Sequence, residues 1–238
     1  MKDVTEVKDL FNAKAGTWNQ KYQPGGALSF RVAAFEEILL RRLSPGDTVL
    51  DLGCGTGAIA SALAARGFRV TACDVAEEMI GAGKRIFNES VIEWLLLPSD
   101  WKRLPFDANA FDAIVASSIF EYLPDVDAVL AECQRILKPG GFLVATVPNP
   151  RKLIRKLENL IRPAAILASQ ITVLKRVPKL HSYTSYLKYS RNRMPLDDWF
   201  AIGARAQLSA VEQDRSRTGN TALAFLVYRK PATNSDNV

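Results

Sequence analysis

Two acids and three glycines in the first third of the chain have the types and spacing to bind a charged ligand that carries a ribose. Asp51 precedes Gly53, Gly55 and Gly57, and Asp74 ends the next apolar run. Glycines at alternate positions let a ligand approach the backbone, and the amides that open a following helix point toward it. Asp51 could hold an amine, while Asp74 could accept hydrogen bonds from both ribose hydroxyls.

Alternating strand and helix patterns surround this loop from residue 48 onward, which is typical of a parallel sheet covered on both faces. Residues 208–217 and 222–230 are expected to pair as a hairpin across Thr218, Gly219 and Asn220. Apolar residues at helical spacing predict helices within residues 5–43. The patterns predict strands at 48–53, 69–74, 92–97, 111–117 and 141–148, and helices at 57–66, 76–87, 126–137 and 196–206.

The composition favours one domain in a reducing compartment. A chain of 238 residues, 48% of them hydrophobic, can fill one core and is too short for two comfortable domains. Cys54, Cys73 and Cys133 lie in apolar patterns, which argues against a disulfide framework. Residues 1–6 are charged where a signal peptide would be apolar. We therefore expect a cytoplasmic protein, at most peripheral to a membrane.

The positive charge is concentrated in one segment. Residues 151–193 contain eleven Lys or Arg and one acid, Glu158, which gives this segment +10 within a chain of net charge +6. The remainder is therefore mildly acidic, at −4. The segment predicts a pair of basic amphipathic helices over 151–177, interrupted at Pro163.

The glycine loop with its two acids resembles motif I and the acidic partner of the class I S-adenosylmethionine-dependent methyltransferases. Over most of residues 11–148 the chain is similar to the small-molecule branch of quinone and biotin pathways. The resemblance implies a Rossmann-like, doubly wound α/β fold with a seven-stranded, mostly parallel sheet and an antiparallel last strand. A nicotinamide or flavin site is the rival hypothesis, because Gly53, Gly55 and Ala58 satisfy G-x-G-x-x-A. Asp51 disfavours it, since a dinucleotide lacks the amine.

The resemblance also implies a cofactor site for S-adenosylmethionine, with S-adenosylhomocysteine as product. Trp18 and Tyr22 would belong to a lid over the cofactor, with ordinary core aromatics as the alternative, and Arg31 would meet the methionine carboxylate. Trp101 could stack on the adenine or simply cover an apolar edge. The remaining residues implied to bind the cofactor are Asp51, Gly53, Cys54, Gly55, Gly57, Asp74, Val75, Met79, Asp100 and Ser117.

The candidate catalytic residues are Glu121, Tyr122 and His181. The first two follow the fourth predicted strand, where the resemblance places the transferred methyl group, but Tyr122 replaces the family's usual histidine. A tyrosine with its ordinary pKa of about 10 is a poor base at neutral pH. His181, the only histidine, could be the general base or a surface residue. We expect no metal, because no cluster of metal-ligating residues is visible.

The basic segment leaves the partner open. It could rest on an anionic membrane surface, dock an acidic carrier protein, cap a pocket for an anionic small molecule, or form a solvated lid. Nucleic acid is disfavoured, because the segment interleaves aliphatic residues where RNA recognition uses aromatic ones.

We therefore expect a single domain over residues 1–238, with an acceptor that the sequence does not identify. Its function is predicted to be O- or C-methylation of a small or lipid-like acceptor in biosynthesis. The alternatives are a saccharide or carrier-bound polyketide acceptor, and a cofactor-binding regulator without turnover. The oligomeric state stays open. The parts are a helical lid (5–43), a cofactor-binding core (48–148), a basic acceptor-side insert before the sixth strand (151–193), and a C-terminal helix and hairpin (195–230).

Overall fold

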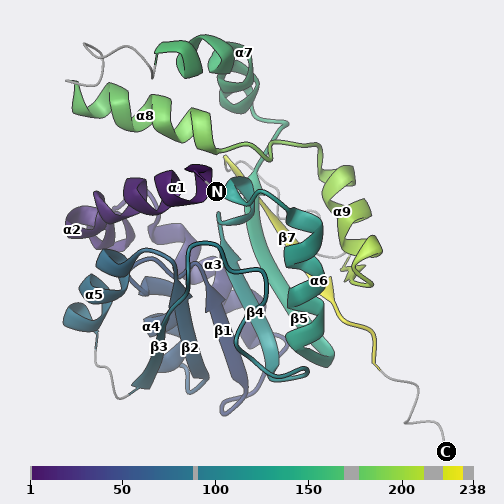
Figure 1. Cartoon of the computed structure of the whole chain (residues 1–238). Helices are drawn as coiled ribbons and strands as arrows, with labels where there is room; N and C mark the ends of the chain where they lie inside the picture. The colour runs from purple at the N-terminus through teal and green to yellow at the C-terminus, as the bar shows by residue number, and fades with distance from the viewer. Residues whose placement is uncertain (1, 88–90, 169–176, 212–221, 233–238) are drawn as a thin grey trace, which may run out of the picture.

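A seven-stranded sheet forms the centre of the protein (Figure 1). The computed structural model describes residues 2–87, 91–168, 177–211 and 222–232. The strand order is β3-β2-β1-β4-β5-β7-β6, and β7 is the strand that runs antiparallel to its neighbours. This arrangement confirms the predicted fold class. The strands are β1 (Thr48–Leu52), β2 (Arg69–Asp74), β3 (Ile92–Leu96), β4 (Phe111–Ser117), β5 (Leu137–Pro148), β6 (Ser209–Ala210) and β7 (Leu223–Arg229).

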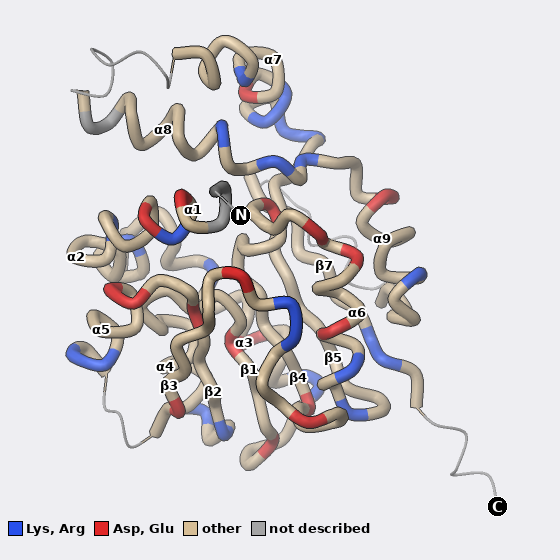
Figure 2. The backbone as a smooth tube through the Cα atoms, viewed as in Figure 1, with Lys and Arg blue, Asp and Glu red and all other residues tan. Residues whose placement is uncertain are grey.

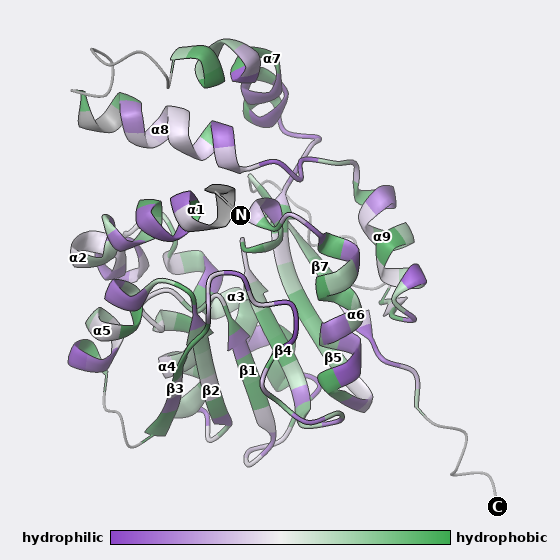
Figure 3. Ribbon diagram, in the orientation of Figure 1, coloured by the Kyte–Doolittle hydropathy of each residue, from purple (hydrophilic) through white to green (hydrophobic). Residues whose placement is uncertain are grey.

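Each face of the sheet is covered by helices that bury alternate strand residues. In β1, Leu50 and Leu52 pack in one cluster with residues of α6 (Val126–Ile136) and α9 (Leu196–Arg205). Val49, the residue before Leu50, points to the other face and packs in a second cluster with residues of α3 (Ser29–Leu40) and α4 (Ala58–Ala65). Parallel strands that are buried on both faces have nearly continuous apolar sequences. Figure 3 shows the hydrophobic colour, green, along much of the central strands.

The predicted boundaries agree closely with the structure for most elements. The helices predicted at 57–66, 76–87, 126–137 and 196–206 correspond to α4, α5 (Glu77–Ile86), α6 and α9. The fifth strand begins earlier than predicted, at Leu137, because the chain pairs with β4 on both sides of an irregularity between Phe111 and Ala113. Of the predicted hairpin, β6 and β7 pair, and its turn at Thr218–Asn220 lies outside the described residues.

Short helices lie over the carboxyl ends of the strands (Figure 1). From the N-terminus these are α1 (Lys2–Asn12), α2 (Ala15–Trp18) and the 3-10 helix η1 (Asn19–Tyr22). From the basic segment come α7 (Leu153–Ala168) and α8 (Pro178–Tyr189), which pack on each other. Another 3-10 helix, η3 (Phe120–Tyr122), follows β4.

The predicted interruption at Pro163 is wrong. Helix α7 continues through this proline. Pro163 is exposed, so water can satisfy the carbonyl that would have bonded to its missing amide hydrogen. The part of the predicted helix pair at residues 171–174 lies outside the described residues. Within the described ranges no helix is both long and apolar enough to cross a bilayer.

Two glycines of α5 differ in how closely they are packed, which gives a matched test of the core. A Cβ on Gly83 would lie 2.5 Å from Cη2 of Trp94 and 2.9 Å from the Thr56 carbonyl, whereas a Cβ on Gly81 would meet only the Arg85 guanidinium at 3.4 Å. Gly83→Ala should lower the free energy of unfolding by about 1–3 kcal/mol through overpacking. Gly81→Ala should leave it unchanged or raise it by up to about 1 kcal/mol, because alanine favours helix. Urea unfolding of both variants measures the difference, and equal effects would contradict the packing described here.

Candidate functional site

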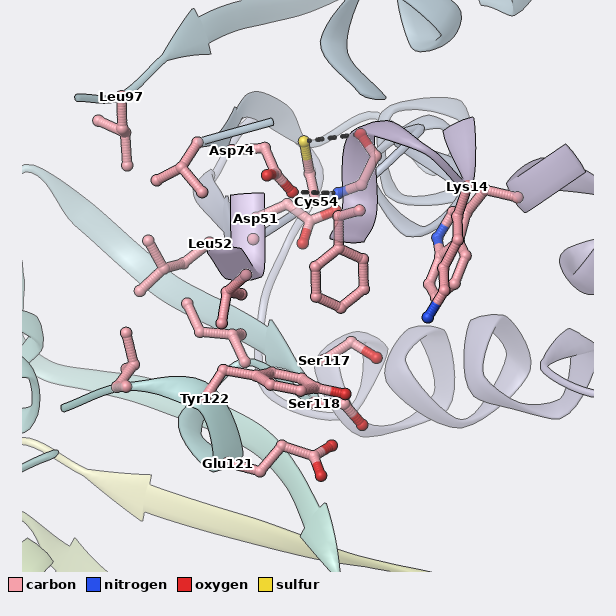
Figure 4. A pocket seen from close by; sticks show the side chains of 18 of the residues that line it. Lys14, Asp51, Leu52, Cys54, Asp74, Leu97, Ser117, Ser118, Glu121 and Tyr122 are labelled. Carbon is pink, nitrogen blue, oxygen red and sulfur yellow. Dashed lines mark hydrogen bonds between the residues drawn. The ribbon is translucent and has the colours of Figure 1, made fainter. Parts of the chain in front are cut away.

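A large cavity lies at the carboxyl ends of β1, β2 and β4, where the topology of an open α/β sheet places ligands. Its volume is about 1320 Å³. Pockets for one ligand typically measure about 300–1,000 Å³, so this cavity has room for a cofactor and an acceptor together. Figure 4 shows side chains of the strand ends, the glycine loop and η3 converging on it. Its walls come from the N-terminal helices, η3, α7 and α8.

Asp51 is a buried carboxylate in this cavity that lacks a complete set of partners. It is 1% exposed, and its Oδ2 accepts a hydrogen bond of 3.1 Å from the Ala60 amide in the first turn of α4. Its Oδ1 is buried without a hydrogen-bond partner in the described part of the chain. Burial, aided by the negative charge of Asp74, raises the pKa of Asp51 to about 7. A ligand ammonium at Oδ1 would supply both the missing bond and the missing charge.

Arg31 is the complementary group. Its Nη1 donates to the Ser117 hydroxyl at 3.1 Å, and its Nε is buried without a partner among the described residues. Tyr22 lies close to both charges, and burial raises the pKa of its hydroxyl. An orphaned acceptor at Asp51 and an orphaned donor at Arg31 in one cavity fit a zwitterionic amino-acid group, as the head of S-adenosylmethionine is.

The glycine loop is held against Asp74 by backbone hydrogen bonds. Gly55 has a φ of 56°, and its amide donates to Oδ2 of Asp74 at 2.8 Å. The Ala76 amide donates to Oδ1 at 2.9 Å. Asp74 lines the cavity and keeps further lone pairs for ribose hydroxyls. A Cβ on Gly55 would lie 2.9 Å from Nε1 of Trp18, so the lid aromatic lies directly over the loop.

Two residues predicted to bind the cofactor do not line the cavity. Gly57 does not line the cavity; a Cβ there would lie 2.3 Å from Cη2 of Trp94. Met79 is fully buried and packs with Ala15, Ala76 and Ala82 beneath the lid. The other predicted cofactor-binding residues all line the cavity: Trp18, Tyr22, Arg31, Asp51, Gly53, Cys54, Gly55, Asp74, Val75, Asp100, Trp101 and Ser117.

Glu121 and Tyr122 of η3 line the same cavity (Figure 4). Glu121 is 3% exposed, accepts a hydrogen bond of 2.5 Å from the Ser190 hydroxyl, and has its pKa raised by burial. Tyr122 meets the ring of Phe11 edge-on, with centroids 5.3 Å apart. Burial and the charge of Glu121 raise the pKa of Tyr122 well above its usual value, so this phenol stays protonated at neutral pH.

His181 is not placed where a base would have to act. It lies on α8 as an exposed residue and does not line the cavity, whereas the neighbouring Ser182 and Tyr183 do. The structure therefore does not bring His181 together with Glu121 and Tyr122.

Lys14, Lys21 and Arg155 also line the cavity, and no role was predicted for them. Burial, with the charge of Lys21, lowers the pKa of Lys14 to about 8. Nη1 of Arg155 donates to the Tyr186 hydroxyl at 2.6 Å. Tyr183 and Tyr186 line the cavity too, and their three-residue spacing indicates an aromatic stripe that lines the pocket or packs beside it. Among the described residues, no group of three or more His, Cys, Asp or Glu side chains could hold a metal ion.

Comparison with known proteins identifies methyltransferases as relatives of this chain. A family model described as a methyltransferase domain matches residues 50–145. A ubiquinone biosynthesis O-methyltransferase of Xanthomonas axonopodis pv. citri is 32% identical over 59% of this chain and 60% of its own length. A demethylmenaquinone methyltransferase of Clavibacter sepedonicus is 32% identical over 75% of this chain and 72% of its own length. The chain thus spans about 60% of the length of the ubiquinone-pathway relatives.

Solved structures share the fold at low identity. A Haloferax volcanii methyltransferase in complex with a methyltransferase activator has a TM-score of 0.65 and 20% identity, covering 93% of this chain and 97% of that one. An S-adenosylmethionine-dependent methyltransferase of Thermotoga maritima has a TM-score of 0.62 and 14% identity, covering 93% and 99%. At these identities the likeness supports the fold alone.

The raised pKa of Asp51 predicts how affinity for S-adenosylhomocysteine depends on pH. Binding of the ligand ammonium needs the ionised carboxylate, so affinity should fall as the pH is lowered through about 7. Between about pH 8 and about pH 5.5 we expect a loss of about tenfold to thirtyfold, which follows the ionised fraction of such a group.

Calorimetric titration across this range measures the effect. Asp51→Asn should bind more weakly and with a flatter pH profile. His181→Gln should keep the full pH dependence, because His181 lies outside the cavity. The assignment to Asp51 would be contradicted if the affinity lost its pH dependence in the His181 variant and kept it in the Asp51 variant.

Proposed function

The chain belongs to the class I S-adenosylmethionine-dependent methyltransferases, and we propose that it transfers the cofactor's methyl group to a small aromatic or lipid-like acceptor. The observation that carries the cofactor half is the pair of orphaned polar atoms, Asp51 Oδ1 and Arg31 Nε, in one cavity. These would hold the amino-acid head, Asp74 the ribose, and Asp100 with Trp101 the adenine. When bound, the cofactor supplies a methyl group already activated on a sulfonium.

The acceptor half of the proposal rests on the aromatic lining of the cavity. Phe11, Tyr122, Tyr183 and Tyr186 line it together with Leu223. Flat aromatic walls suit a ring acceptor, and the relatives carry names of quinone biosynthesis. The chain's part in catalysis is then to orient the acceptor atom in line with the methyl group and to exclude water beneath the N-terminal helices.

We assign the proton acceptor to Glu121 where the acceptor is a hydroxyl. Its carboxylate faces the cavity, and the Ser190 hydroxyl fixes its orientation. Tyr122 keeps its own proton and serves as a hydrogen-bond donor or a packing surface. A carbon acceptor would need Glu121 only if a ring proton leaves after transfer.

Replacing Glu121 separates these roles. Glu121→Gln should reduce kcat on a phenolic or quinol acceptor by about 10²–10⁴ while leaving the affinity for S-adenosylhomocysteine within about twofold. Activity of the parent enzyme should rise with pH through a value above the ordinary range of a glutamate, because burial raises this pKa. The Glu121→Gln variant should lose this rise of activity with pH.

Two matched variants serve as controls in the same assay. His181→Gln should retain activity, because the residue is exposed outside the cavity. Tyr122→Phe should keep the rise of activity with pH that is assigned to Glu121. Tight binding of S-adenosylhomocysteine without transfer to any acceptor in a panel of phenols, quinols and glycosides would favour a cofactor-binding regulator instead.

We further propose that α7 meets an anionic membrane surface, from which a lipid-like acceptor would enter. The usual burial pattern is reversed in this helix. Its one buried side chain is the charged Glu158, whereas most of its aliphatic side chains are exposed. Leu153, Leu160 and Leu167, at two-turn spacing, are 81%, 77% and 67% exposed. Figure 2 shows Lys and Arg positions at the start of α7 and along the connection from α8 to α9. An exposed apolar face beside basic residues is the pattern of an interfacial helix.

Vesicle sedimentation tests this surface. The double variant Leu153→Gln/Leu160→Gln should lose at least about tenfold in binding to phosphatidylglycerol vesicles, since each buried leucine contributes about 1.5–3 kcal/mol. Leu40→Gln, which changes a 45%-exposed leucine on α3, is the control and should bind as the parent does. Parent protein that stays in the supernatant with anionic vesicles but binds an acidic carrier protein would favour the carrier.

A further inference from the structure

A second, smaller cavity lies between α7 and the connection from α8 to α9. Its volume is about 300 Å³, and it shares no lining residue with the large cavity. Within the described ranges its lining includes three arginines and no acid; these residues are Asn159, Arg162, Arg191, Asn192, Arg193 and Met194. We refer to it as the arginine pocket.

Arg193 is the buried member of this pocket. Its side chain is 5% exposed, with Nη1 on Glu158 Oε2 at 2.8 Å and Nε on the Ser190 hydroxyl at 2.9 Å. Its Nη2 is buried and has no hydrogen-bond partner among the described residues. A buried charged donor without an acceptor is unfavourable, so an acceptor group that reached this atom would be stabilising.

Among the described residues, Glu158 is the acid that pairs with an arginine of the pocket. Glu158, the nearby acid, is shared between Arg155 and Arg193, at 2.7 Å and 2.8 Å. Arg162 donates through Nε to the Leu187 carbonyl at 2.9 Å, and burial with the charges of Arg193 and Arg191 lowers its pKa. The guanidinium groups therefore repel one another, and a bound anion would relieve this repulsion.

We propose that the arginine pocket binds a phosphate group, held by Arg162, Arg191 and the free Nη2 of Arg193. Guanidinium groups bind phosphate through paired, charge-assisted hydrogen bonds, and a phosphate offers enough oxygens for several of them. The phosphate could belong to a free or small phosphorylated molecule or to a lipid headgroup. Leu160 and Ile161, which are exposed on α7 beside Asn159 and Arg162, leave the second source open.

The arginine pocket is joined to η3 through residues 190–192. The amides of Arg191 and Asn192 donate to the Glu121 carbonyl at 2.8 Å and 3.2 Å, and the Ser190 hydroxyl bonds to the Glu121 carboxylate. The Asn192 side-chain amide donates to the Phe120 and Leu123 carbonyls, each at 2.7 Å. A phosphate bound by Arg191 and Arg193 would therefore steady the segment that fixes Glu121.

The test compares two double variants with the same loss of charge. Arg162→Gln/Arg191→Gln removes two pocket guanidiniums, while Arg151→Gln/Lys156→Gln removes two exposed charges outside the pocket. Each protein is titrated with inorganic phosphate at constant ionic strength, by thermal shift and phosphorus NMR line width, without cofactor or acceptor. The result is therefore independent of the methyltransferase proposal. Arg162→Lys, which keeps the charge, serves if the double variant does not fold.

We expect phosphate to raise the Tm of the parent and of the exposed-charge variant, and the pocket variant to bind at least about tenfold more weakly. Vesicles of phosphatidylglycerol in phosphatidylcholine, against phosphatidylcholine alone, form the second arm. Dependence on the pocket with phosphate identifies a free phosphate, and dependence with anionic vesicles alone identifies a lipid headgroup. An equal loss in both double variants, or no binding of either probe by the parent, overturns the proposal.

Discussion

The buried carboxylate of Asp51 is the constraint on which the rest of the site depends. It lies on the central strand β1, between β2 and β4, and forms no ion pair within the described part of the chain. Such burial disfavours the charged form, and the pKa rises to about 7. What makes the position tolerable is the N-terminus of α4, which supplies the Ala60 amide and the positive end of a helix dipole. The glycine turn is what brings that helix end over the carboxylate.

The cations of the cavity are arranged around Asp51 without neutralising it. Arg31 is held by Ser117, and mutual repulsion between Lys14 and Lys21 adds to burial in lowering the pKa of Lys14 to about 8. The cavity therefore presents separated charges of both signs. A ligand with an ammonium and a carboxylate on one carbon satisfies both, whereas a nicotinamide dinucleotide has no ammonium group that could donate a hydrogen bond to Asp51. This electrostatic difference favours S-adenosylmethionine over a nicotinamide cofactor more strongly than the glycine spacing does.

Periodicity predicted the elements well because buried strands and amphipathic helices dominate this fold. The site residues were implied by the family resemblance instead, and their surroundings depend on what packs from elsewhere in the chain. The resemblance implied cofactor contacts for Gly57 and Met79, but neither lines the cavity, and Trp94 lies against Gly57. The position of α8, which leaves His181 outside the cavity, depends on how α7 and α8 pack.

The ionic network of Arg155, Glu158 and Arg193 serves mainly to orient neighbouring side chains. Glu158 is 4% exposed and bridges Arg155, which lines the large cavity, and Arg193, which lines the arginine pocket. A buried ion pair contributes little net stability compared with apolar residues of similar size. Its value here is geometric, because Arg193 also bonds to Ser190, which in turn orients Glu121. The reversed burial pattern of α7 follows from the same arrangement: its charged face is required inside, so its aliphatic face is left outside for a partner to cover.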